Sequence, residues 1–198
     1  MDAFALLQLP RQLTLEERVL HQAYAALSRT AHPDHGGSAE EAAGVNAAYE
    51  LLRSPEKRIK HLLEIAAPPD AKAWRAVPLD ESMMALFSAV GAALDTSAKY
   101  LEKRAAARSA LARALLAGEE LEQRERMEDL GNALAERLQS MEDGLPALDE
   151  ALAAGESTGE AGAGLWKEIA GLQARFAYVI KWQAQVRERL LQLTLPPG

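Results

Sequence analysis

The fold of the N-terminal part is decided by the stretch Arg29-Thr30-Ala31-His32-Pro33-Asp34-His35-Gly36-Gly37-Ser38, which lies between two segments with helical patterns. Proline disfavours helical geometry at the residue before it, so the first helix is expected to end near Ala31. Gly36 and Gly37 allow the chain to reverse before a second helix begins at Ser38. Helices joined by so short a connection lie antiparallel, so His-Pro-Asp is predicted at the exposed tip of a helical hairpin.

Three sequence signals mark where helices begin. Thr14-Leu15-Glu16-Glu17 has the form of a capping box before the first helix of the hairpin, and Ser38-Ala39-Glu40-Glu41 has it before the second. In such a box the hydroxyl accepts from the third helical amide while the glutamate reaches back. Ser54-Pro55 predicts a further helix, with Ser54 as N-cap and Pro55 at the first helical position. Residues 1–67 are therefore predicted to form a small helical domain.

Composition limits the class of protein. The chain has 198 residues, 48% of them hydrophobic, no cysteine and a net charge of −7. The missing cysteines exclude disulfides and thiolate metal sites and fit a reducing compartment. The acidic balance argues against a nucleic-acid partner, and no apolar run is long enough to span a membrane. The N-terminus shows no targeting pattern, so the expected location is the cytoplasm.

From Asp80 onward the pattern predicts three long amphipathic helices, over about 81–117, 119–153 and 165–193. Gly118 is expected to end the first helix, and Gly144 and Pro146 to kink or break the second. Helices with one apolar face bury those faces against each other. Residues 80–198 are therefore predicted to form a three-helix bundle, with 68–79 as a prolyl linker. The predicted apolar seam of the first helix is Met84, Phe87, Gly91, Leu94, Ala98, Leu101, Ala105, Ala112 and Leu115. That of the second is Met127, Leu130, Leu134, Leu138, Met141, Leu145, Leu148 and Leu152, and that of the third is Trp166, Ile169, Leu172, Phe176, Val179, Gln183, Val186 and Leu190.

The N-terminal residues resemble a J-domain, the module that activates DnaK-type ATPase chaperones. The match includes His32-Pro33-Asp34, the helix Val45-Asn46-Ala47-Ala48-Tyr49-Glu50-Leu51-Leu52 and the turn Ser54-Pro55-Glu56-Lys57-Arg58. A J-domain followed by a three-helix bundle is similar to the HscB co-chaperones of iron–sulfur cluster assembly. Arg58-Ile59-Lys60-His61-Leu62-Leu63 and the last helix, beginning at Trp166, extend that resemblance over nearly the whole chain.

The resemblance implies a function without catalysis and without a cofactor. The expected partners are a DnaK/HscA-type ATPase chaperone, whose hydrolysis the chain stimulates, and an IscU-type scaffold protein, which the bundle delivers to it. The alternative is a J-domain co-chaperone whose bundle is an adaptor for a different client. No phosphate-binding loop is present, so ATP belongs to the partner.

The chaperone-binding residues implied by the resemblance are His32, Pro33, Asp34, Arg29 and Arg18. Asp34 offers an anionic acceptor for an arginine on the chaperone, and proline reduces the entropy lost when the loop binds. Two features depart from the family. The hairpin's first helix has little excess of positive charge, and residues 1–67 hold seven Lys and Arg against nine Asp and Glu, a net −2.

Three other interpretations of the hairpin tip are less consistent with the sequence. His32-Pro33-Asp34 alone is also compatible with a plain turn. A general base with an orienting carboxylate is disfavoured, because no nucleophile is marked and an exposed tip excludes no water. A metal site would need the four histidines, His21, His32, His35 and His61, to converge without any cysteine, so no metal is expected.

The client-binding residues implied by the resemblance are Met83, Met84 and Phe87 at the start of the bundle, with Phe176 on the last helix. Flexible methionine side chains suit a contact surface. At 100° per residue Met84 and Phe87 are expected on the seam, with Met83 to its side. Core packing is the competing role for Met84 and Phe176. Ser88, Gly91 and Asp95 stand where the family usually has several glutamates, so weaker or differently oriented binding is expected.

Overall fold

The computed structural model describes residues 1–68, 80–154 and 159–195, with only the backbone described for 159–161 and no side chain described for Pro33. All secondary structure in these ranges is helical, which confirms the all-α prediction. Within the same ranges, no helix has the length and apolarity needed to cross a membrane.

The chain divides into two compact units. One combines the described residues of Met1–Val77 with Met141–Phe176, and the other combines those of Pro78–Ser140 with Ala177–Gly198. The second unit begins near residue 80, where the sequence predicts the bundle, but part of the predicted bundle belongs to the first unit. The predicted linker lies outside the described residues apart from Pro68.

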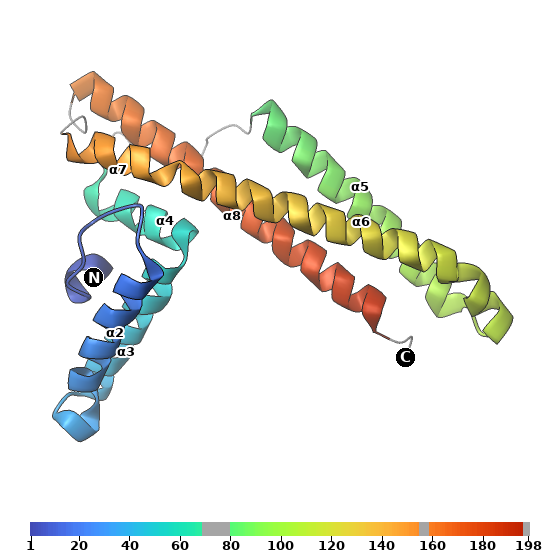
Figure 1. The fold of residues 1–198 in the computed structure, drawn as a ribbon, viewed down its shortest axis with the longest axis horizontal. Coiled ribbons are helices and arrows are strands. Elements are labelled where there is room, and N and C mark those ends of the chain that lie inside the picture. The colour runs from blue at the N-terminus through green and yellow to red at the C-terminus, as the bar shows by residue number, and fades with distance from the viewer. Residues whose placement is uncertain (69–79, 155–158, 196–198) are drawn as a thin grey trace. The chain divides into compact units, whose positions relative to one another are not determined.

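The first unit opens with four helices, α1 (Ala3–Leu6), α2 (Glu17–Ala31), α3 (Ala39–Arg53) and α4 (Pro55–Ala66). α2 and α3 lie side by side and run antiparallel, which is the predicted hairpin (Figure 1). The Ser38 capping box is formed in full, and Ser54 caps α4. The predicted box at Thr14 is wrong, because α2 begins two residues too late for it and its N-cap, Glu16, makes no side-chain cap.

Arg58 is the buried cation of this unit. Its Nε donates to the carbonyl of Leu13 at 2.7 Å, and its Nη1 donates to the carbonyl of Leu52 at 2.6 Å. Burial lowers the pKa of the Arg58 guanidinium, and the nearby carboxylates of Glu142 and Asp149 oppose that shift. Arg58 therefore joins α4 to the end of α3 and to the segment before α2.

Two helices from later in the chain complete the first unit, α7 (Leu145–Ala153) and the first part of α8 (Gly159–Thr194). The carboxylate of Asp149 on α7 accepts from the amides of Leu13 and Thr14, both at 2.7 Å. Gln173 on α8 donates to Glu56 at 2.9 Å. These side chains tie the J-domain-like helices to α7 and α8.

The second unit is built from α5 (Glu81–Ala106), α6 (Ala110–Asp143) and the last part of α8 (Figure 1). The predicted kink near Gly144 is confirmed, since α6 ends at Asp143 and α7 begins at Leu145. The predicted stop at Gly118 is wrong, because the chain breaks at 107–109 instead. There the Ser109 hydroxyl accepts from the Ala112 amide and caps α6.

The predicted seam of α5 is also wrong, by one residue. Its buried side chains are Met83, Val90, Ala93, Ser97 and Tyr100. One position is a rotation of 100° about a helix axis, so the predicted seam residues Met84 and Phe87 lie at the surface instead. In the seams predicted for the two later helices, the buried residues are Met127, Leu134, Met141, Leu145, Trp166, Ile169, Leu172, Phe176, Val179 and Val186. The other six predicted seam residues, Leu130, Leu138, Leu148, Leu152, Gln183 and Leu190, are half-buried.

The hairpin loop is a short 3₁₀ turn, η1 (Pro33–His35), held at its start by one carbonyl. The carbonyl of His32 accepts from the amides of His35, at 2.9 Å, and of Gly37, at 3.1 Å. Gly36 has φ of +91°, a conformation that side chains disfavour. A Cβ on Gly37 would lie 2.2 Å from the carbonyl oxygen of Ala31, so position 37 has no room for a side chain.

Replacing Gly37 with alanine is expected to lower the free energy of unfolding by about 1–3 kcal/mol, since backbone atoms of Ala31 must move. Gly44→Ala is the matched control in the same hairpin. Its Cβ would meet only a side-chain methyl of Leu6 at 3.9 Å, so it is expected to stabilise α3 by about 0.5–1 kcal/mol. Urea unfolding followed by circular dichroism measures both changes, and a Gly37→Ala protein as stable as Gly44→Ala contradicts the loop geometry.

Candidate functional site

The side chains of His32 and Asp34 stand at the exposed tip of the α2–α3 hairpin. Their exposed fractions are 55% and 82%. The Asp34 amide donates to Nδ1 of His32 at 3.2 Å, and the Asp34 carboxylate lies 3.5 Å from the same nitrogen. The loop thus orients the imidazole and leaves the carboxylate open to solvent.

Arg18 and Arg29, the two predicted basic contacts, share one face of α2. They are eleven residues apart, which places them within about 20° around the helix and roughly 16 Å along it. Both side chains are exposed. Arg18 lies 3.9 Å from Glu16, and Nε of Arg29 donates to the carbonyl of Ala25. The structure therefore brings Arg29 to the last turn before the loop and leaves Arg18 near the opposite end of α2.

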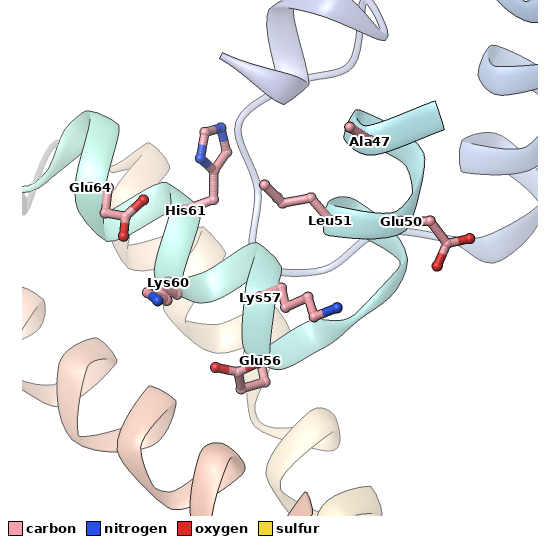
Figure 2. Close-up of a pocket in the computed structure, with 8 residues that line it drawn as sticks. All are labelled: Ala47, Glu50, Leu51, Glu56, Lys57, Lys60, His61 and Glu64. Carbon is pink, nitrogen blue, oxygen red and sulfur yellow. The ribbon is translucent and has the colours of Figure 1, made fainter. Parts of the chain in front are cut away.

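A separate pocket of about 420 Å³ lies between α3 and α4 (Figure 2). Lys57, Lys60 and His61 line it together with three carboxylates. His61 is buried and its Nε2 accepts from the Ala3 amide at 3.0 Å, so this ring supports α1. Because the lining side chains carry charges of both signs, the pocket indicates no particular ligand. Its other lining residues are Ala47, Glu50, Leu51, Glu56 and Glu64.

The four predicted client-binding residues divide into two buried and two exposed side chains. Met83 and Phe176 are both fully buried, so neither offers a surface to a partner in this structure. Met84 and Phe87, on α5, are about half exposed. The predicted arrangement, with Met83 to the side of the seam and Met84 on it, is wrong. Met83 is buried and Met84 is exposed, because the α5 seam is shifted by one residue.

Two aromatic residues of α8 that the sequence analysis did not select lie beside Phe87. The ring of Trp182 is 6.0 Å from that of Phe87, and Tyr178 is 5.9 Å from Trp182. Trp182 is buried and Tyr178 is exposed. The four-residue spacing of Tyr178 and Trp182 was the available signal, because it places both rings on one helix face. Met84, Phe87 and Tyr178, resting on Trp182, are called the α5–α8 patch below.

No group of three or more histidine or acidic residues in the described ranges is placed to hold a metal ion. The rings of His32 and His35 are 6.3 Å apart, and His61 is hydrogen-bonded to α1.

No protein-family model matches the sequence.

Two curated co-chaperones share part of the sequence. A tetratricopeptide repeat and J domain-containing co-chaperone of Cryptococcus neoformans is 38% identical over 60 residues, 30% of this chain and 11% of that protein. A protein of Cupriavidus taiwanensis described as a co-chaperone protein HscB homolog is 40% identical over 73 residues, 32% of this chain and 42% of that protein. The alignments thus span less than half the length of either relative.

A solved structure with a similar fold covers nearly all of this chain. Chaperone HscB from Vibrio cholerae has a TM-score of 0.53 and 20% identity, and the match covers 98% of this chain and 99% of that one. At that identity the likeness speaks for the fold, and the curated HscB homolog adds the likeness in sequence. Fold and sequence together identify this chain as similar to the HscB-like J-domain co-chaperones.

Proposed function

We propose that this protein is a co-chaperone that stimulates the ATPase of a DnaK/HscA-type chaperone and delivers an IscU-type iron–sulfur scaffold protein to it. The observation that carries the proposal is the exposed His32-Pro33-Asp34 loop, at the tip of the hairpin formed by α2 and α3. The similarity to a curated HscB homolog supports it. The proposal includes a cytoplasmic location, and neither nucleic acid nor a membrane is a partner in it.

The chemistry of the loop suits recognition of a cationic partner group. The Asp34 carboxylate is open to solvent and can accept two charge-assisted hydrogen bonds from one arginine. The hydrogen bonds to the His32 carbonyl and Nδ1 hold the loop in place before binding, which lowers the entropy lost on association. Binding the hydrolysis-competent state of the chaperone more tightly than its other state is sufficient to shift the chaperone toward it.

In this proposal the protein itself is not an enzyme and uses no cofactor. The imidazole and the carboxylate are both open to water, an arrangement that gives a general base no protected substrate site. Arg18 and Arg29 add positive charge along one face of α2, but Glu16 and Glu17 stand at its start. Electrostatic steering of the chaperone encounter is therefore expected to be weak.

The α5–α8 patch is the part of the predicted client surface that solvent reaches. Met84 and Phe87 present flexible and aromatic contact area, and Tyr178 adds a ring with a polar end. Met83 and Phe176 contribute packing beneath the surface in place of direct contacts. We propose that the scaffold protein binds this patch.

A second function keeps the co-chaperone role but replaces the client. Two of the four residues expected to bind the scaffold are buried, and Ser88, Gly91 and Asp95 stand where glutamates are typical of the family. Both features favour a bundle that acts as an adaptor for a different protein.

His32→Gln and Asp34→Asn are each expected to abolish stimulation of the chaperone's ATP hydrolysis, because each removes a group that faces the partner. His35→Gln, the same change made in the same exposed loop, is the matched control and is expected to retain most of the stimulation. Single-turnover ATP hydrolysis by a DnaK-type chaperone measures the effect, and circular dichroism checks the fold. Full stimulation by either of the first two variants would falsify the proposed role of the loop.

The double variant Met84→Ser, Phe87→Ser is expected to weaken binding of the scaffold protein by about tenfold or more, since exposed apolar anchors dominate such contacts. Leu121→Ser, another exposed apolar side chain of the same unit, is the control and is expected to bind normally.

Met83→Ala is expected to lower the free energy of unfolding by about 2–5 kcal/mol, because it opens a cavity.

Isothermal titration calorimetry with the scaffold protein and thermal unfolding separate these effects. Equal binding by the double variant and by Leu121→Ser contradicts the patch. A wild-type chain that stimulates the chaperone but does not bind the scaffold supports the adaptor function instead.

A further inference from the structure

Two hydrogen-bond donors of α8 stand at the α5–α8 patch without a partner. The side chains of Tyr178 and Lys181 are both exposed. Within the described ranges, neither the Tyr178 hydroxyl nor the Lys181 ammonium takes part in a hydrogen bond or an ion pair. The two residues are three positions apart, which places them about 60° apart around the helix and roughly 4.5 Å apart along it. One acceptor group of a partner can therefore reach both donors.

The two donors border an apolar surface. Met84 and Phe87 on α5 are 49% and 52% exposed, and the buried ring of Trp182 contacts the rings of both Phe87 and Tyr178. The hydroxyl of Ser88, which follows Phe87, already donates to the Met84 carbonyl at 3.0 Å. All of these residues belong to the second unit. The surface thus combines apolar area from α5 with free donors from α8.

Acidic residues are missing from the segments that form this surface, although the whole chain has a net charge of −7. Residues 82–94 on α5 contain no charged side chain, and residues 169–187 on α8 contain three basic residues and no acidic one. The nearest acidic residues along the two helices are Glu81, Asp95, Glu168 and Glu188, and Asp95 is paired with Lys99 at 2.7 Å. A cationic group of a partner would therefore meet no carboxylate within the patch, whereas an anionic group would meet two donors.

We propose that the α5–α8 patch selects a partner segment that carries an aspartate or glutamate next to an apolar side chain. The apolar side chain packs on Met84 and Phe87, and the carboxylate accepts from Lys181 and from the Tyr178 hydroxyl. Lys181 is then a residue that determines specificity, because the sign of its charge decides which partners are accepted. The inference rests on the proposed client-binding role of the patch and adds the chemical class of the segment that binds there.

The charged contact is expected to contribute more to specificity than to affinity. An exposed ion pair changes an equilibrium constant by a factor of up to about five, and the apolar contact supplies most of the binding. Because salt screens exposed charges, binding is expected to weaken between about 50 and 500 mM salt.

Two synthetic peptides with the same leucines test the preference, one with glutamates between the leucines and one with lysines in those places. Amide chemical shifts of the isotope-labelled full chain measure binding and show where it occurs. The wild-type chain is expected to bind the acidic peptide at the patch about fivefold to tenfold more tightly than the basic peptide. Lys181→Glu is expected to reverse that preference, and Tyr178→Phe is expected to weaken binding of the acidic peptide by about twofold to fivefold.

Arg187→Glu is the matched control, since it makes the same change of charge on another exposed side chain of α8. Arg187 lies nine positions after Tyr178, on the opposite side of the helix, so this variant is expected to keep the preference for the acidic peptide. Equal effects of Lys181→Glu and Arg187→Glu overturn the inference, as does a wild-type chain that binds both peptides equally or neither. Circular dichroism confirms that each variant remains folded, which these exposed positions favour.

Titration with the scaffold protein separates this inference from the proposed function. A wild-type chain that prefers the acidic peptide but does not bind the scaffold protein supports the inference and contradicts the scaffold as client. A chain that binds the scaffold protein equally well with and without Lys181→Glu overturns the inference and leaves the proposed function intact.

Discussion

The J-domain-like part of the structure depends on the hydrogen bonds that the Arg58 guanidinium donates. It lies buried between the carbonyls of Leu13 and Leu52, and the amide of Leu13 in turn donates to Asp149 on α7. A buried cation is costly unless its donors are paired, and here two backbone carbonyls and nearby carboxylates meet that need. One side chain thereby joins α4, the end of α3 and the segment before α2. Removing it would leave both carbonyls unpaired as well as losing the contacts.

Burial distinguishes the polar side chains of α4 from those of the hairpin loop. Arg58 and His61, both on α4, are buried and hydrogen-bonded to backbone atoms. Asp34, in contrast, has its carboxylate in solvent, and the backbone around it is set by one carbonyl and by a glycine with no room for a side chain. A loop fixed by backbone hydrogen bonds and an accessible carboxylate both favour recognition by a partner.

The hairpin was predictable from sequence because its signals are local: a proline, two glycines and the Ser38 box. The surface of α5 was not, because helical phase depends on packing against distant residues. The actual seam includes Ser97 and Tyr100, whose polar atoms mask it in the sequence. The structure satisfies them with Arg189, which donates to the Ser97 hydroxyl, and with Glu120, which accepts from the Tyr100 phenol. Burial and Glu120 raise the pKa of Tyr100 to about 12. Because the seam is shifted by one position, Met83 is buried and Met84 is exposed, the opposite of their predicted places.

We propose that the protein uses two separate contact regions, one for each of two partners. Amide chemical shifts of the isotope-labelled chain, followed as each partner is added, test this most directly. The ATP-bound chaperone is expected to perturb residues 29–37 and to leave α5 unchanged. The scaffold protein is expected to perturb the amides near Met84, Phe87 and Tyr178 and to leave the hairpin loop unchanged. A chaperone that leaves the loop unperturbed, or two partners that perturb the same residues, would contradict the account.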